Sequence, residues 1–156
     1  MGSTWDIQKC IYNQLINDST VSNLVNNKIY DEPPTNAEYP YITIGDEVCI
    51  DDNDLSHNGY IVNITIDIHT TTTTITNTYL PYSTLAENQI VGSGYFIGKY
   101  IYKYVNDVLH YKKFTLDSDE MVICKLEQMF TTKIKDKRLI TARYEILVDT
   151  NTQVTF

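Results

Sequence analysis

Two residues that could bind a metal or transfer a proton, Asp67 and His69, stand two positions apart in the segment NITIDIHT. Side chains two positions apart in an extended strand point to the same face, so this pattern makes the two residues neighbours. A protein zinc site usually has three or four protein ligands, and the surrounding sequence offers no third one. We therefore expect a solvated or interfacial pair, and we predict no metal site and no cofactor.

Other stretches with chemical potential lack an essential part. The acidic segment DDNDLSHNG, residues 51–59, is rich in oxygen ligands, but it lacks the central glycine and the closing glutamate of a calcium-binding loop. The segment GSGYFIG, residues 92–98, lacks the GxGxxG spacing of a dinucleotide-binding turn. No Ser-His-Asp or Cys-His arrangement can be assigned from spacing. The sequence therefore predicts no catalytic residues and no enzyme.

Composition favours one acidic globular domain spanning residues 1–156. The chain has 20 acidic and 12 basic residues, a net charge of -8, and 42% hydrophobic residues. An acidic surface argues against a protein that grips nucleic acid, because phosphate contacts need clustered lysine and arginine. Cys10, Cys49 and Cys124 are too widely spaced for a disulfide framework or a zinc motif. No apolar run is long enough to span a membrane, and no secretion signal is recognisable, so we expect no membrane partner.

Hydrophobic periodicity predicts which elements carry these residues. Apolar residues at helical spacing predict helices over about 4–16 and 96–110, and Ser19 or Thr20 is expected to cap a short second helix. Strict alternation predicts a strand from Tyr60 to His69, with one buried face and one solvated face. The alternation predicts further strands at residues 29–30, 40–48, 122–127 and 140–148. Pro40 fits the first position of its strand, one of the few places where a sheet tolerates proline.

Helices and strands in this order predict an α+β fold. We expect an antiparallel sheet of about four or five strands with helices packed on one face, because the alternating strands require a dry side and a wet side. A long inserted loop at about residues 70–95 interrupts the plan, and loops of this length are usually functional or disordered.

This inserted loop carries apolar residues that a simple linker would not need. Tyr79, Leu80, Tyr82 and Leu85 could anchor an arm on a neighbouring subunit or on a partner protein. The other interpretation is a locally folded insertion packed on its own domain.

The stretch IYDEPPTNAEYPYITI, residues 29–44, gives the chain a family resemblance. A short strand, two prolines and a Pro-Tyr pair that opens a strand follow the N-terminal helix and the segment VSNLV. A long alternating strand comes next, and then a helix with Ile101, Val105, Val108 and Leu109 and a C-terminal hairpin. In this order the chain resembles the tail-completion proteins of bacteriophages, also called tail terminators or head-to-tail joining proteins.

The resemblance implies a structural virion protein of the neck and tail, assembled in the cytoplasm of a bacterial host. It implies a ring of identical subunits, expected to be a hexamer, that ends the tail tube and joins it to head-completion or connector proteins. DNA would pass through the lumen without specific binding. Acidic side chains facing the lumen would repel phosphate, and the candidates are Asp51, Asp52, Asp54 and Asp67. The alternative for these acids is an ordinary solvated surface.

Two other functions compete with this one. The first is a different head-completion or adaptor protein of the phage neck. The second belongs to another class: a small ligand-binding accessory domain with its site under the inserted loop.

Overall fold

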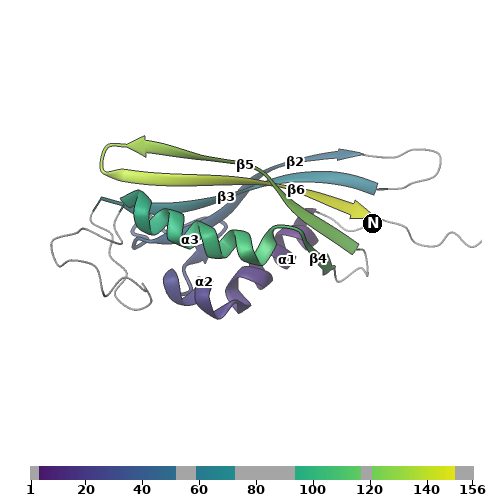
Figure 1. Cartoon of the computed structure of the whole chain (residues 1–156), viewed down its shortest axis with the longest axis horizontal. Helices are drawn as coiled ribbons and strands as arrows, with labels where there is room; N and C mark the ends of the chain where they lie inside the picture. Colours follow the sequence, from purple (N-terminus) through teal and green to yellow (C-terminus); the bar gives the residue numbers. More distant parts are fainter. Residues whose placement is uncertain (1–3, 52–58, 73–93, 117–120, 150–156) are drawn as a thin grey trace, which may run out of the picture.

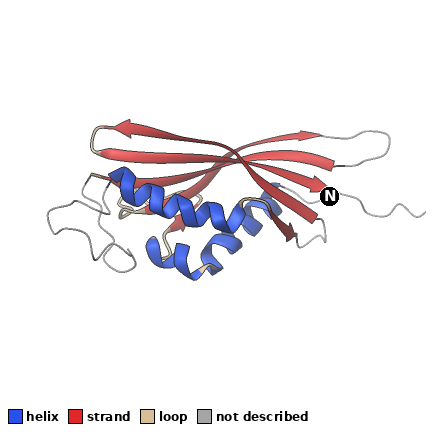
Figure 2. Ribbon diagram, in the orientation of Figure 1, coloured by secondary structure: helices blue, strands red, loops and turns tan. Residues whose placement is uncertain are grey.

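The computed structural model describes residues 4–51, 59–72, 94–116 and 121–149. Three helices and six strands make up this part of the chain (Figures 1 and 2). The helices are α1 (Thr4–Asn17), α2 (Ser19–Leu24) and α3 (Gly94–Leu109). The strands are β1 (Ile29–Tyr30), β2 (Tyr41–Asp51), β3 (Gly59–Thr71), β4 (Lys112–Thr115), β5 (Met121–Ile134) and β6 (Lys137–Asp149).

The strands form one sheet in the order β1-β2-β3-β6-β5-β4. Every neighbouring pair is antiparallel except β1 and β2, which run parallel. The predicted α+β class is therefore confirmed, but the expected four or five strands are a slight undercount of the six. The missed strand is β4: only Phe114 of its four residues is buried, so the segment has too little alternation to reveal a strand.

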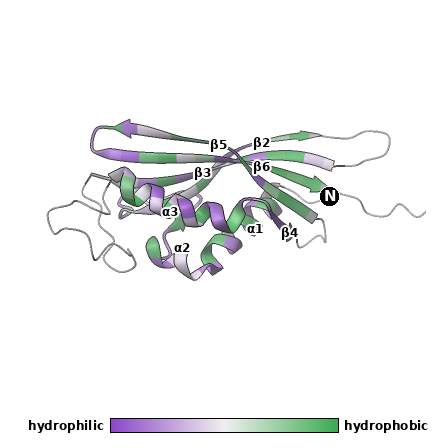
Figure 3. Cartoon of the chain, viewed as in Figure 1, coloured by the Kyte–Doolittle hydropathy of each residue, from purple (hydrophilic) through white to green (hydrophobic). Residues whose placement is uncertain are grey.

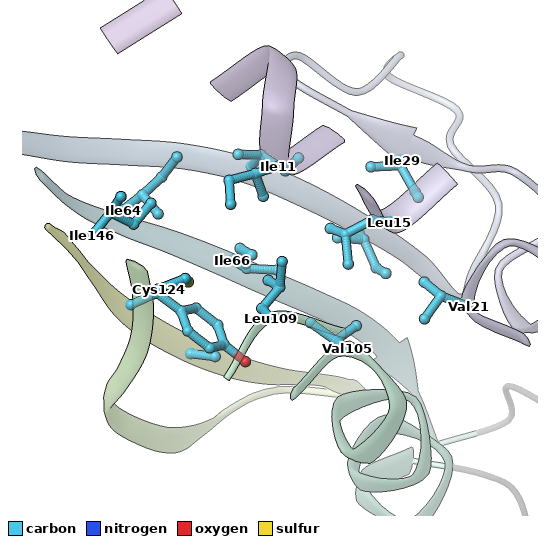
Figure 4. Packing of buried hydrophobic residues seen from close by; sticks show 14 of the residues in the cluster. Ile11, Leu15, Val21, Ile29, Ile64, Ile66, Val105, Leu109, Cys124 and Ile146 are labelled. Atoms are coloured by element: carbon cyan, nitrogen blue, oxygen red, sulfur yellow. The ribbon is translucent and has the colours of Figure 1, made fainter. Parts of the chain in front are cut away.

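All three helices cover the same face of the sheet, as Figure 1 shows. Their apolar stripes meet the inward residues of the strands, and Figure 4 shows Ile11 and Leu15 of α1, and Val105 and Leu109 of α3, beside Ile66 of β3. The core continues along β6, where Tyr144 is fully buried and its hydroxyl donates a hydrogen bond to Asn106 Oδ1 at 3.0 Å. One covered face and one uncovered face follow directly from the alternation in the strand sequences.

Local signals explain where the first two helices end and begin. The carboxylate of Asp18 accepts a hydrogen bond from the Val21 amide at 2.9 Å, so Asp18, rather than Ser19 or Thr20, caps α2. Asn26 and Asn27 have φ values of 52° and 61°, a left-handed conformation that asparagine tolerates and that ends the helical segment. None of the helices in the described ranges is long and apolar enough to cross a membrane.

Strands β2 and β5 each carry a bulge, and we call the part of each strand beyond its bulge the projecting part. The register of β2 shifts between Gly45 and Glu47, and that of β5 shifts between Leu126 and Gln128. Beyond each bulge, almost all side chains whose burial is described are exposed, on both faces of the strand. The projecting parts lie at opposite ends of the long axis, with the end of β2 at the right and the end of β5 at the left of Figure 1.

Candidate interaction surface

The side of the sheet that carries no helix in the described ranges is the first candidate surface, and we call it the open face. It is formed by the outward residues of the central strands β3 and β6 and by their neighbours on β2 and β5. Cross-strand register places His69 beside Tyr41 and Leu139, and Asp67 beside Thr43 and Thr141. The sequence-based expectation that Asp67 and His69 share the wet face is therefore confirmed.

A hollow of about 670 Å³ lies across the middle of the open face. Its lining runs from the bulge of β2 to the bulge of β5, and its charged residues are Asp46, Glu47, Asp67, Glu127 and Arg143. Carboxylates therefore outnumber the single guanidinium in this hollow.

Asp67 is held in place inside the hollow. The Thr141 hydroxyl donates a hydrogen bond to its Oδ1 at 2.7 Å. Burial raises the pKa of the Asp67 carboxyl, and the nearby charge of Asp46 raises it further, whereas the Thr141 hydrogen bond acts in the opposite direction. The carboxylate is thus a partly desolvated negative charge on the open face, kept in a fixed orientation.

His69 has a separate set of partners. Its ring stacks on Tyr41 with centroids 4.4 Å apart and planes 10° apart, and its Nε2 lies 2.9 Å from Thr43 Oγ1. Burial lowers the pKa of His69 to about 4, and the charge of Lys137 acts in the same direction. The imidazole is therefore neutral at physiological pH. Within the described ranges, no group of three histidine, cysteine or acidic residues is placed to hold a metal.

One end of the open face carries a row of apolar side chains that the sequence analysis missed. Register aligns Ile50, Ile61, Leu147 and Ile123 across β2, β3, β6 and β5. Ile50, Leu147 and Ile123 are 52%, 40% and 39% exposed. Each residue interrupts the polar side of its own strand, but only strand pairing brings the four together. A contiguous apolar row open to solvent is typical of a protein contact.

The second candidate surface consists of two sheet edges. Strand β1 pairs with β2 only at Ile42 and Thr43, so no described strand lies outside β2 beyond that point. Strand β4 pairs with β5 only over Met121–Cys124, which leaves the end of β5 equally open within the described ranges. Both projecting ends bear apolar side chains: Val48 and Ile50 on β2, and Met129, Phe130 and Ile134 on β5. Figure 3 shows the apolar end of β2.

Several residues singled out from the sequence lie elsewhere. Asp51 is the last residue of β2, and its side chain is outside the described set. Asp52 and Asp54, and the apolar residues of the inserted loop (Tyr79, Leu80, Tyr82 and Leu85), lie outside the described ranges. The same holds for most of the inserted loop, under which the alternative ligand site was expected.

Comparison with known proteins supports the family resemblance. Residues 9–78 match the model of a family described as tail completion protein gp17. These residues include most of α1 and run through β3. No curated protein sequence matches the chain.

A solved structure has a similar fold. It is a chain of the virion of a native gene transfer agent (GTA) particle, with a TM-score of 0.71 and 20% sequence identity. The alignment covers 92% of the present chain and 94% of the other. At this identity the likeness establishes the shared fold, and together with the family match it supports a structural protein of a virion tail. The resemblance inferred from the sequence is thus confirmed, and over residues 9–78 this chain is similar to the bacteriophage tail-completion proteins.

Proposed function

We propose that the protein forms a ring of identical subunits that ends the tail tube of a phage-like particle and joins the tail to the head. The observation that carries this proposal is the tail-completion match over residues 9–78, mapped onto a sheet that is covered by helices on only one side. The bare side and the projecting ends of β2 and β5 leave apolar surface for contacts with other subunits.

A ring requires one contact to be repeated around an axis. Such a heterologous contact joins two different surfaces of the same chain, and it closes when the rotation per copy divides a full turn. The molecule offers two different surfaces at opposite ends of its sheet, on β2 and on β5. We propose a hexamer, bound on one side to the tail-tube protein and on the other to head-completion or connector proteins.

Passage of DNA through the ring requires a lumen that does not hold phosphate. We propose that acidic residues face this lumen, with Asp67 as the candidate whose position on the open face is described. Asp46 and Glu127 also line this hollow and add to its negative charge. Like charges on the wall and on the DNA repel each other, so the DNA slides without a binding site.

Assembly on tail tubes tests the proposal. The protein would be mixed with the tail-tube protein of the same particle, and tube length and tube ends would be measured by electron microscopy. We expect a ring with a central channel at one end of each tube and tubes that stop growing. Tubes grown without the protein are the control. If the protein is absent from tube ends and tube length does not change, the proposed function is wrong.

A different place in the neck is the competing function. A head-completion or adaptor protein would also form a ring, but it would bind connector proteins in the absence of tail tubes. Labelling the protein in intact particles and measuring its distance from the end of the tube separates the two positions.

A further inference from the structure

We infer that the ring closes by strand addition: the projecting end of β2 in one copy pairs antiparallel with the projecting end of β5 in the next. This inference rests on the proposed ring. It names the surfaces that join the copies and implies that the sheets of all copies merge into one continuous sheet.

The first support is the shape of the two sheet edges. The short strand β1 occupies only the beginning of the outer side of β2, and β4 occupies only the beginning of the outer side of β5. The Leu126 amide is also satisfied, because it donates to His110 Nδ1 at 2.9 Å. Within the described ranges, each edge therefore has a paired half and an open half, and the open halves lie at opposite ends of the molecule. The open half of β2 in one copy can therefore pair with the open half of β5 in the next copy, and we call this pairing the joint.

Strand direction agrees with the joint. Strands β2 and β5 run in opposite directions, because β3 and β6 stand between them and each neighbouring pair is antiparallel. Rotation about a ring axis that makes an acute angle with the strands keeps the direction of each strand along that axis, so β2 of one copy meets β5 of the next in antiparallel orientation. Antiparallel pairing satisfies the backbone groups of both edges without a change in either fold.

Charge favours the pairing of β2 with β5 over the pairing of two β2 strands or two β5 strands. The projecting part of β2 contains Asp46 and Glu47, whereas the end of β5 and its turn contain Lys133, Lys135 and Asp136. Pairing β2 with β2 would bring acids together, and pairing β5 with β5 would bring lysines together. Opposite charges across strands are favourable and like charges are unfavourable, so the mixed pairing is preferred.

One register of this pairing sets opposite charges against each other and sets apolar side chains against each other. It also keeps paired side chains on the same face of the merged sheet. It sets Asp46–Asp51 against Met129–Ile134 of the partner subunit, with Glu47 opposite Lys133 of the partner subunit. Ile50 then faces Phe130 of the partner subunit, and both residues lie on the open face, as their own cross-strand partners Ile61 and Thr141 do. A shift by one residue would place open-face residues against the opposite face, because side chains alternate with a period of two.

The same register is compatible with a wide closed ring. It offsets successive copies by about six residues, or about 20 Å along the strands at roughly 3.3 Å per residue. Four strands per copy, β2, β3, β6 and β5, add a width of about 19 Å at the usual strand spacing. The resulting strand tilt of about 45° to the ring axis is at the upper end of the range for closed barrels. Six copies would contribute about 24 strands, more than the number that already leaves a channel in porins.

Disulfide trapping tests the joint directly. Cys49 is exposed and belongs to no disulfide, and the register places it opposite Thr131 of the partner subunit. Directly opposed residues have Cα atoms about 4.5–5.5 Å apart, which suits a disulfide. Under mild oxidation of the assembled protein, we expect Thr131→Cys to form a ladder of linked subunits that ends at the full ring. The matched control is Thr115→Cys, an exposed threonine on β4, and the double variant Cys49→Ser/Thr131→Cys should also give no ladder.

Charge reversal provides a second test with an internal rescue. Glu47→Lys and Lys133→Glu should each raise the concentration needed for assembly by about tenfold or more, and the double variant should restore it. Lys113→Glu on β4 is the control, and unfolding midpoints of the separate subunits verify that every variant is folded. Rings that assemble without crosslinking and without charge rescue would overturn the joint and leave the proposed function standing. Failure to form rings on tail tubes would overturn both.

Discussion

The two faces of strand β6 differ in how far their side chains are buried. On β6, Ile146 is completely buried against the helices, whereas its neighbour Leu147 is 40% exposed on the open face. The two residues have similar size and adjacent positions, and only the direction of the side chain separates them. The covered face holds the subunit together, and the open face keeps apolar surface that the subunit does not use for its own folding.

The largest expected difference comes from truncating these two residues. Ile146→Ala should lower the free energy of unfolding by about 2–5 kcal/mol, because it leaves a cavity in a packed core. Leu147→Ala should cost less than about 1 kcal/mol in the separate subunit, since its side chain is already partly in water. Urea denaturation of both variants measures the contrast. Equal losses would show that the open face contributes to the core after all.

Two glycines sharpen the same contrast with a smaller effect. A Cβ atom on Gly98 of α3 would lie 2.9 Å from Ile140 Cδ1, whereas a Cβ on Gly45 of β2 would have no heavy atom within 4 Å. Gly98→Val should therefore push α3 away from the sheet and cost about 1–3 kcal/mol. Gly45→Val should change stability by about 0.5 kcal/mol or less. Thermal unfolding compares the two variants, and a larger loss for Gly45→Val would contradict the assignment of the covered and open sides.

The smallest effect concerns pH and a residue of the open face. The pKa of His69 is lowered to about 4 in the folded protein, chiefly by burial, whereas an unfolded histidine titrates near 6.5. The fold therefore favours the neutral ring, so its contribution is complete above about pH 6.5 and is lost as the pH falls toward 4. Since His69 is only partly buried, we expect a loss on the order of 1–2 kcal/mol.

The variant His69→Gln isolates this contribution, because glutamine keeps a polar side chain but does not titrate. Denaturation curves at pH 7.5 and pH 4.5 should show a smaller acid-induced loss for the variant than for the natural protein. Carboxylates titrate in both proteins, so the difference between their pH profiles is the quantity that reports on His69. Profiles that run parallel would show that the imidazole is equally solvated in the folded and unfolded chains.

Sequence patterns predicted the elements with strong periodicity and missed those without it. Helix α3 and strand β3 were predicted within a few residues because each has an uninterrupted apolar pattern over its length. Strand β4 was missed because only Phe114 distinguishes it from a loop. The helix cap was misplaced by one residue, since Asp18, Ser19 and Thr20 are all suitable caps and only the bond to the Val21 amide selects among them.

The candidate surface was only partly predictable for a related reason. Asp67 and His69 could be placed on one face because both belong to the same strand. The apolar row and the two open edges depend on which strands pair and where each pairing stops, and a single strand does not contain that information. Ile123 and Leu147 are far apart in the chain, and only the β5–β6 register places them side by side.

By itself, the sequence determined the α+β class, the one-sided sheet, the acidic character and the resemblance to tail-completion proteins. These properties follow from composition and from short-range periodicity, which depend on neighbouring residues along the chain. Tertiary structure alone decided the sheet order, the hollow around Asp67 and the unmatched lengths of β1 and β2, and of β4 and β5. Register joins residues that are far apart in the chain, so the open edges exist only once the sheet has formed.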